Sequence, residues 1–272
     1  MKKLIVLAVL MALVVGCSST KHGNQMGSDA APGGERAQPI ADPIRPVNEV
    51  FFTFNDKLYF WVLKPAAQGY SFVLDNLYYG TVTYGTLGYA SVEPEGARKG
   101  VRNFFRNLAM PIRAVNCLLQ GNLGGTGVEL QRFGVNTTVG VLGFGDPATH
   151  WGLSRQREDF GQTIGSYGAG PGIYIVWPVF GPSSIRGTVG IVGDYFLNPL
   201  SYYPPSSVVR TGIKVYERVN TTSLRIGDYE EIKDQFSPYV ALRDAYHQHR
   251  AFLVRQQGEG KDGENGEAGP MP

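Results

Sequence analysis

Residues 42–63 read DPIRPVNEVFFTFNDKLYFWVL, and this stretch decides the fold class. Apolar residues recur three or four positions apart, which is the period of an α-helix: Ile44, Val47, Phe51, Phe54, Leu58 and Trp61. Further apolar residues fill much of the remaining circumference: Phe52, Tyr59, Phe60, Val62 and Leu63. A helix that is apolar on nearly all sides is either buried or faces lipid. We expect it to start at Asp42 as N-cap with Pro43 at the first helical position, and to end at Pro65.

The rest of the chain body is also predicted to be mainly α, in short amphipathic pieces bounded by Gly and Pro. The expected helices lie at about 95–108, 111–120, 127–140, 183–196, 208–219 and 237–255. Residues 172–180 fit a strand or a buried extended segment, although Pro178 argues against a central strand. The residues Gly181–Ser184 fit a turn followed by a helix cap. We predict neither a spanning helix nor a β-barrel, because long apolar runs after residue 17 and regular strand alternation are both missing.

The amino terminus predicts export and lipid attachment. Lys2 and Lys3 precede the apolar run 4–15, which has the length of a signal-peptide core and is too short to span a bilayer. The small residues before Cys17 resemble a bacterial lipobox, which implies acylation of Cys17 and cleavage after Gly16. Serine at position 18 implies the outer membrane rather than the inner one. The alternative is an ordinary secretory signal in which Cys17 has no special role.

Composition divides the chain and excludes some functions. We expect a signal peptide at 1–16, the lipidated cysteine with a flexible tether at 17–40, one domain at 41–256, and a Gly-rich disordered tail at 257–272. Removal of Lys2 and Lys3 lowers the 25 basic residues to 23, which equals the 23 acidic residues. This balance argues against a nucleic-acid partner. Cys117 lies in an apolar stretch and is expected to be a buried thiol without a disulfide partner.

The residues of common catalytic and cofactor sites are missing from the sequence. We find no Walker A motif, nucleophile elbow, HExxH or CxxC. The acids Glu158 and Asp159 fit a capped, solvated first turn of a helix rather than a catalytic pair. We therefore predict no enzyme activity, no cofactor and no metal site. From the residues alone, two alternatives stay open: a soluble all-α periplasmic domain with an aromatic core, and short helices that lie in one leaflet of a membrane.

A set of colinear motifs resembles the VacJ/MlaA family of outer-membrane lipoproteins. The amino-terminal motifs are Asp42-Pro43, NEVFFTFNDKLY at 48–59, LKPAAQGY at 63–70, GVRNFFRNL at 100–108 and LQG at 119–121. The later ones are RFGVNTTVG at 132–140, DPA at 146–148, REDFGQTIG at 157–165, the spaced residues Gly168, Gly170, Gly172, Tyr174 and Pro178, GPS at 181–183, SPY at 237–239 and RDAY at 243–246. The resemblance covers about 41–255 in order, and it agrees with the lipobox.

The resemblance implies a ring of short amphipathic helices embedded in the inner leaflet of the outer membrane, lipid-anchored on the periplasmic side. Phospholipids mislocalised in the outer leaflet would pass through a central channel to a periplasmic lipid-carrier protein, for retrograde transport that maintains lipid asymmetry. A trimeric porin is the other implied partner. The alternative is a structural, porin-associated envelope lipoprotein without lipid transfer activity. An envelope hydrolase would need an ordered polar triad, and the sequence suggests none.

Several polar or motif positions are candidates for the lipid path. Asn48, Asn55 and Asp56 interrupt the apolar first helix, and such residues in a lipid setting should face a polar path or find hydrogen-bond partners. Phe160 and Gly161 belong to the most specific motif. We interpret these five as channel or gating residues or, alternatively, as caps and packing positions.

One segment departs from the family pattern. Residues 75–91, with tyrosines interleaved with Gly and Thr, form an apparent insertion. It is expected to be a hairpin, a lipid-interface loop or a surface insertion without function.

Overall fold

The computed structural model describes the backbone of residues 40–85 and 95–266, and side chains within 40–77 and 95–256. The chain divides into two compact units, Met1–Gln38 and Pro39–Pro272, and all described residues belong to the second. The predicted signal peptide, Cys17 and most of the tether therefore lie outside the described residues.

The first helix is longer than predicted. Helix α2 (Arg45–Leu58) continues through a π-helical segment, η1 (Tyr59–Leu63), into α3 (Lys64–Gly85). Its N-cap is Ile44, and the proline near its start is Pro46 rather than Pro43. The prediction that Pro65 ends the helix is wrong. Proline lacks an N–H and crowds the carbonyl four residues before it, and the wider π turn that precedes Pro65 accommodates both effects.

The apparent insertion is helical over its first part. Residues 75–85 belong to α3, so the hairpin alternative is wrong for them, and residues 86–91 lie outside the described part of the chain. Asp75 of this helix pairs with Arg98, with 3.0 Å from its Oδ1 to Nε. This buried ion pair attaches α3 to the helix that follows in the sequence.

Most of the other predicted helices are present. They are α4 (Gly96–Leu108), α5 (Met110–Leu119), α6 (Leu123–Thr138), α9 (Ile185–Leu197), α10 (Ser207–Ser223) and α12 (Pro238–Gly266). Helix α6 starts four residues earlier than predicted, because the Asn122 side chain caps it by accepting from the Gly125 N–H. Helix α12 runs past Arg255 into the expected tail, where Gln, Glu and Lys favour helix. Short helices complete the set: α7 (Pro147–His150), α8 (Phe160–Ser166), the 3₁₀ turn η2 (Pro199–Ser201) and α11 (Asp228–Lys233).

The predicted extended segment forms a two-stranded antiparallel hairpin. Strand β1 (Tyr174–Trp177) pairs with β2 (Gly181–Ser184), and Tyr174 lies opposite Ser184. Pro178 lies in the connecting turn, where its missing N–H removes nothing from the ladder. The interpretation of 181–184 as a turn is wrong, although Ser184 does cap α9 by accepting from the Gly187 N–H.

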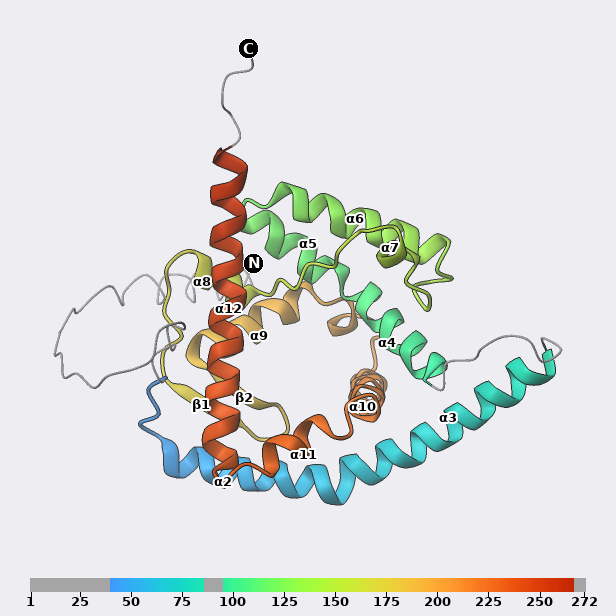
Figure 1. Cartoon of the computed structure of the whole chain (residues 1–272), viewed down its shortest axis with the longest axis horizontal. Helices are drawn as coiled ribbons and strands as arrows, with labels where there is room; N and C mark the ends of the chain where they lie inside the picture. Colours follow the sequence, from blue (N-terminus) through green and yellow to red (C-terminus); the bar gives the residue numbers. More distant parts are fainter. Residues whose placement is uncertain (1–39, 86–94, 267–272) are drawn as a thin grey trace, which may run out of the picture. The chain divides into compact units, whose positions relative to one another are not determined.

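Within the Pro39–Pro272 unit, the elements contact one another in a closed succession (Figure 1). Helix α2 continues through η1 into α3, and α3 packs on α4. Next along the ring, α4 contacts α5, which contacts α9. Helix α9 contacts β2, and β2 contacts α2, which closes the ring. Helix α10 packs on α3 and α4, and α12 packs on α8 and β2. The predicted ring of short helices is thus confirmed. No helix within the described residues is long and apolar enough to cross a membrane.

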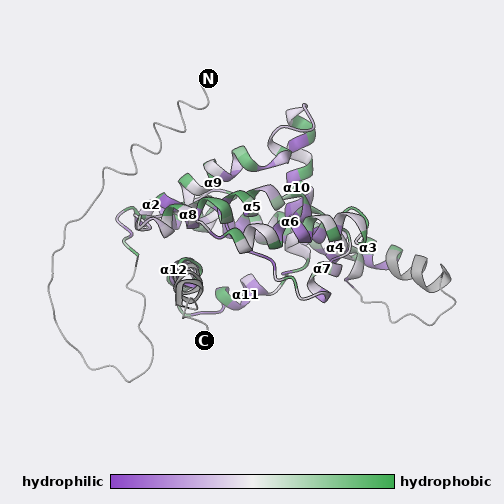
Figure 2. Cartoon of the chain, turned by 90° about the horizontal axis from the view of Figure 1, so that it is seen from above, coloured by the Kyte–Doolittle hydropathy of each residue, from purple (hydrophilic) through white to green (hydrophobic). Residues whose placement is uncertain are grey.

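The burial pattern is inverted relative to a water-soluble protein. The apolar core is small and consists of Ile40, Tyr174, Val176 and Tyr239 with their partly buried neighbours. Helix α6 buries Gly125, Glu129, Arg132 and Asn136, whereas Leu123, Leu130, Phe133 and Val139 are exposed. Figure 2 shows hydrophobic residues along α5, α8 and α9. Helices that turn polar faces inward and apolar faces outward fit a surrounding of lipid.

Candidate functional site

A cavity of about 320 Å³ lies among α2, η1, the β-hairpin, α10 and α11. Its apolar lining consists of Phe52, Leu58, Leu63, Val176, Val179, Phe180, Pro182, Ile232 and Leu242. Its polar and aromatic lining consists of Asn55, Tyr59, Arg218, Thr221, Thr222, Arg225, Asp228 and Tyr229, and Gly181 completes the lining. The cavity thus offers both apolar side chains and cationic and hydroxyl groups to one ligand.

Asn48 fastens the hairpin to α2. Its side chain is fully buried; it donates to the Tyr174 carbonyl (3.0 Å) and accepts from the Val176 N–H (2.8 Å). The same amide nitrogen donates to Asp42 Oδ1 at 2.8 Å. All of these contacts hold β1 and the segment before α2, and Asn48 is not among the residues that line the cavity. Its contacts match the alternative of a packing position.

Asn55 holds the turn of the hairpin and also lines the cavity. Its amide donates to the Trp177 carbonyl (2.9 Å) and accepts from the Val179 N–H (2.7 Å). Val179 has a φ of 71°, a left-handed conformation that a β-branched residue rarely adopts. The two hydrogen bonds therefore stabilise a strained turn at the cavity wall.

Asp56 attaches α11 to α2. Its carboxylate accepts from the Tyr229 hydroxyl (3.1 Å) and from Lys233 Nζ (2.8 Å). Burial and the nearby Asp56 carboxylate raise the pKa of Tyr229, which therefore stays a neutral donor. Next to it, Glu230 of α11 pairs with Lys64 Nζ at 2.6 Å. The first helix thus carries polar residues that position other parts of the cavity wall.

The cavity-facing residues of α10 and α11 are functional candidates that sequence reasoning missed. The last turns of α10 supply Arg218, Thr221 and Thr222, and Arg225 follows the end of that helix. The first two residues of α11 supply Asp228 and Tyr229. The signal in the sequence was the polar side of an amphipathic helix. That signal does not say whether a polar side faces solvent or an interior, so the assignment needed the tertiary structure.

Phe160 and Gly161 lie where α8 crosses α9, away from the cavity. A Cβ added to Gly190 of α9 would lie 2.6 Å from the Gly161 nitrogen, so the two backbones are in direct contact. The Phe160 ring packs over Gly193, where an added Cβ would lie 2.3 Å from a ring carbon. Within the described part of the chain, α8 contributes no residue to the cavity lining. Their contacts are those of packing positions, and a gating role is not visible in them.

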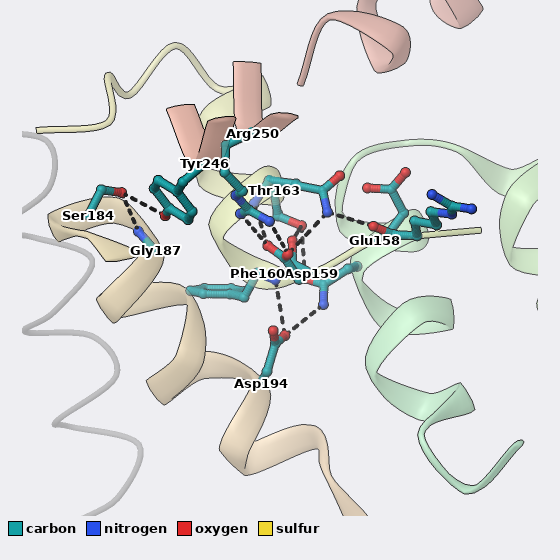
Figure 3. Close-up of polar contacts among 12 residues, drawn as sticks. Glu158, Asp159, Phe160, Thr163, Ser184, Gly187, Asp194, Tyr246 and Arg250 are labelled. Atoms are coloured by element: carbon teal, nitrogen blue, oxygen red, sulfur yellow. Dashed lines mark hydrogen bonds and ion pairs between the residues drawn. The ribbon is translucent and has the colours of Figure 1, made fainter. Parts of the chain in front are cut away.

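The Asp159 carboxylate is the centre of a polar network that joins α5, α8, α9 and α12 (Figure 3). It caps α8 by accepting from the Gln162 N–H, and Arg250 of α12 binds both of its oxygens. Burial alone would raise the pKa of Asp159, but these donors outweigh burial and lower it. The expected cap is confirmed, and Arg250 of α12 covers part of the turn that we expected to be solvated, so Asp159 is only partly exposed.

Asp194 is a second, half-buried carboxylate in the same network. It accepts from the Phe160 N–H (3.0 Å) and from Asn116 Nδ2 (3.0 Å). Burial and the charge of Asp159 raise the pKa of Asp194 to about 6. Gln120 links the network to Glu158, with 3.0 Å between Nε2 and Oε2. These contacts make the network a structural clamp rather than an arrangement of nucleophile, base and oxyanion donors.

Cys117 and the potential metal ligands form no reactive or metal-binding group among the described residues. The thiol of Cys117 is fully buried, as predicted, and burial raises its pKa to about 12, so it is an unreactive packing group. Across residues 40–85 and 95–266, no three His, Cys, Asp or Glu side chains gather closely enough to hold a metal ion.

Comparison with known proteins identifies relatives along most of the chain. The model of a family described as "MlaA lipoprotein" matches residues 40–84 and 75–253. The intermembrane phospholipid transport system lipoprotein MlaA of Escherichia coli K12 is 30% identical over 268 residues, covering 97% of this chain and 92% of the relative. An uncharacterised protein of Rickettsia bellii is 34% identical over 220 residues, covering 79% of this chain and 78% of that protein.

A solved structure, described as "Structural basis for maintenance of bacterial outer membrane lipid asymmetry", has the same fold. The TM-score is 0.63 and the sequence identity is 28%, and the match covers 79% of this chain and 99% of that one.

Proposed function

Because this chain belongs to the MlaA lipoprotein family, we propose that it removes mislocalised phospholipids from the outer leaflet of the outer membrane through a central channel. Its relatives are named for intermembrane phospholipid transport, which supports a role in outer-membrane lipid asymmetry. The receiving partner in this proposal is a periplasmic lipid-carrier protein, and a trimeric porin holds the lipoprotein in place. The sequence has no Walker A motif, so net direction has to come from a partner with higher affinity for the lipid.

The observation that carries the proposal is the mixed lining of the cavity. Apolar side chains such as Leu63 and Phe180 line it together with the cationic Arg218 and Arg225, and Arg218 donates to the Val179 carbonyl at 3.5 Å. A phospholipid has the same division between acyl chains and an anionic headgroup. A cavity that satisfies both parts lowers the cost of moving such a molecule out of a leaflet.

The outward faces of the helices support a position in the membrane. Large apolar side chains are exposed on several elements: Val50, Phe54, Trp61, Phe72, Leu123, Leu130, Val141, Leu142, Ile191 and Val208. Water-soluble monomers rarely expose so many together, and each buried CH₂ contributes about 0.8 kcal/mol to membrane binding. In this proposal the ring lies in the inner leaflet, with Cys17 providing the lipid anchor on the periplasmic side.

The first test measures surface-exposed phospholipid in a deletion strain, with and without the restored wild-type gene. We expect an increase on deletion that the wild-type gene reverses. No change, with the protein present in the outer membrane, would contradict lipid removal and favour the structural, porin-associated alternative.

A pair of variants tests whether lipid uses the cavity. Thr222→Trp places a large ring on the cavity wall, whereas Val209→Trp places the same ring at a 49% exposed position on the opposite side of the same helix. We expect only Thr222→Trp to fail in restoring asymmetry, at equal protein levels. Full restoration by Thr222→Trp would refute passage through the cavity.

The anchor has its own test. We expect Cys17→Ala to yield a soluble or inner-membrane-retained protein that does not restore the deletion strain, because two or more acyl chains are needed for stable attachment. Full restoration by this variant would refute an obligatory anchor.

A further inference from the structure

Four arginines surround Arg106, and one of them, Arg225, lines the cavity. This arginine cluster consists of Arg102, Arg106, Arg155, Arg157 and Arg225. The other arginines nearby are neutralised: Arg113 by Glu129 at 2.8 Å, Arg132 by Asp146 at 2.8 Å, and Arg98 by Asp75 at 3.0 Å. Among the described residues, no ion pair joins a carboxylate to Arg102, Arg106 or Arg225, whereas Arg155 also feels the charge of Glu129, which is already paired with Arg113.

The fold brings the cluster together from three segments. Arg102 and Arg106 are four residues apart on α4 and share one face of the helix. Arg98, one turn earlier on that face, donates to the Ser223 carbonyl at 2.6 Å, which places the end of α10 and Arg225 beside α4. Arg155 comes from the connection before α8 and lines the same small hollow as Arg106.

Two further observations show that part of the cluster is buried with donors and charges left uncompensated. The Nε of Arg102 is buried and has no hydrogen-bond acceptor. Burial and the charges of four surrounding arginines lower the pKa of Arg106 to about 10: Arg155, Arg102, Arg225 and Arg157. Like charges that converge without counter-ions destabilise a fold, and functional sites are where such costs concentrate. An anion that binds the cluster would remove this cost.

We infer that the arginine cluster binds the phosphate group of a phospholipid headgroup while the acyl chains occupy the adjoining cavity. Arg225 joins the two features, because it lines the cavity and also belongs to the cluster. Guanidinium groups suit this ligand, since each can donate two parallel hydrogen bonds to phosphate oxygens. The inference deepens the proposed function and rests on it for the choice of a lipid rather than a free phosphate.

The test uses the full chain in an uncharged detergent and three probes. The probes are dihexanoyl-phosphatidylglycerol, dihexanoylglycerol without phosphate, and inorganic phosphate. Native mass spectrometry gives the lipid affinities, and the melting temperature reports phosphate binding. The variants are Arg106→Gln, Arg155→Gln and Arg106→Lys, and the matched control is Arg45→Gln, which removes an exposed arginine paired with Glu49 outside the cluster.

We expect each cluster glutamine variant to bind the phospholipid about tenfold more weakly or worse, with no change for dihexanoylglycerol or for the control. Arg106→Lys should lie between, because it keeps the charge and loses the paired hydrogen bonds. Unchanged phospholipid affinity in the glutamine variants would overturn the inference, and so would an equal loss of dihexanoylglycerol. Inorganic phosphate that stabilises the protein as strongly as the phospholipid does would overturn the lipid assignment in favour of free phosphate.

A second measurement separates ligand binding from folding. Without ligand, Arg106→Gln relieves repulsion, so it should melt at or above the wild-type temperature, whereas added phospholipid should stabilise it less than the wild type. A lower melting temperature without ligand would overturn the inference, because Arg106 would then act in folding. The proposed function has a separate test. A deletion strain with normal surface phospholipid would refute transport even if the cluster binds lipid. An increase in surface phospholipid that the wild-type gene reverses would still support transport even if the cluster variants bind phospholipid as the wild type does.

Discussion

The side chain of Asn48 gives the sharpest test of how the first helix works. Replacement by alanine removes three hydrogen bonds at a site with no exposure: to Asp42 Oδ1, to the Tyr174 carbonyl and from the Val176 N–H. Each such bond contributes about 1 kcal/mol net, and a buried N–H left without a partner costs about 1–3 kcal/mol more. We therefore expect Asn48→Ala to lower the free energy of unfolding by about 4–6 kcal/mol.

The assay is urea unfolding of the purified protein in an uncharged detergent, followed by circular dichroism. The matched control is Asn76→Ala, since Asn76 is exposed and its amide donates to the Phe72 carbonyl of its own helix. This control should change stability by less than about 0.5 kcal/mol. Asn48→Asp adds a second test, because it keeps an acceptor for the Val176 N–H but places a carboxylate beside Asp42. The loss of unfolding free energy in this variant should therefore be largest at neutral pH and smaller in acid.

One result would refute this reasoning. If Asn48→Ala unfolds at the wild-type urea concentration and yet fails to restore lipid asymmetry, the side chain acts on the lipid path. The channel assignment would then replace the structural one.

Three other perturbations follow from the α8–α9 contact and its carboxylates. Gly190→Ala should destabilise the protein by about 2–4 kcal/mol, because its Cβ would lie 2.6 Å from the Gly161 nitrogen. The control Gly212→Ala, whose Cβ would have nothing within 4 Å, should stabilise the protein by about 0.5–1 kcal/mol. Equal unfolding midpoints for the two variants would refute the close contact. The raised pKa of Asp194, about 6, means that the protonated form stabilises the fold below about pH 4 and that this contribution is lost as the pH rises through 6. Asp194→Asn should therefore raise the melting temperature at pH 7.5 by the equivalent of about 3 kcal/mol and leave it almost unchanged at pH 3.5, and an equal change at both values would contradict this. Arg250→Met should remove about 2–3 kcal/mol at neutral pH, where the Asp159 carboxylate with its lowered pKa is ionised, and the difference from wild type should shrink in strong acid; a loss independent of pH would point to packing alone.

The family and most helix positions were predictable because they depend on local features. Pro94 and Glu95 precede α4, Pro111 lies in the first turn of α5, and Ser184 supplies the cap of α9. Propensity, capping and apolar spacing act over a few residues, so they are visible in one sequence. The lipid anchor at Cys17, the tether and the residues 86–91 stay predictions, since they lie outside the described residues.

The same local rules misjudged Pro65 and the acids at 158–159. A proline signals a helix end only where nothing else supports the backbone. Here the π turn and the contacts of α3 with α10 and α4 support it. Asp159 looked solvated because its partner, Arg250, is 91 residues away in the sequence.

A mainly helical chain, an apolar first helix interrupted by polar residues, and the motifs of the family could all be read from the sequence. The roles of the interrupting residues depend on the fold: Asn48 and Asn55 hold the hairpin, and Asp56 holds α11, more than 120 residues later. The fold also turns the polar face of α6 inward and brings four arginines close to Arg106. Periodicity reveals that a helix has two faces, but only long-range packing chooses which face is buried, because that choice depends on the surroundings and not on the helix.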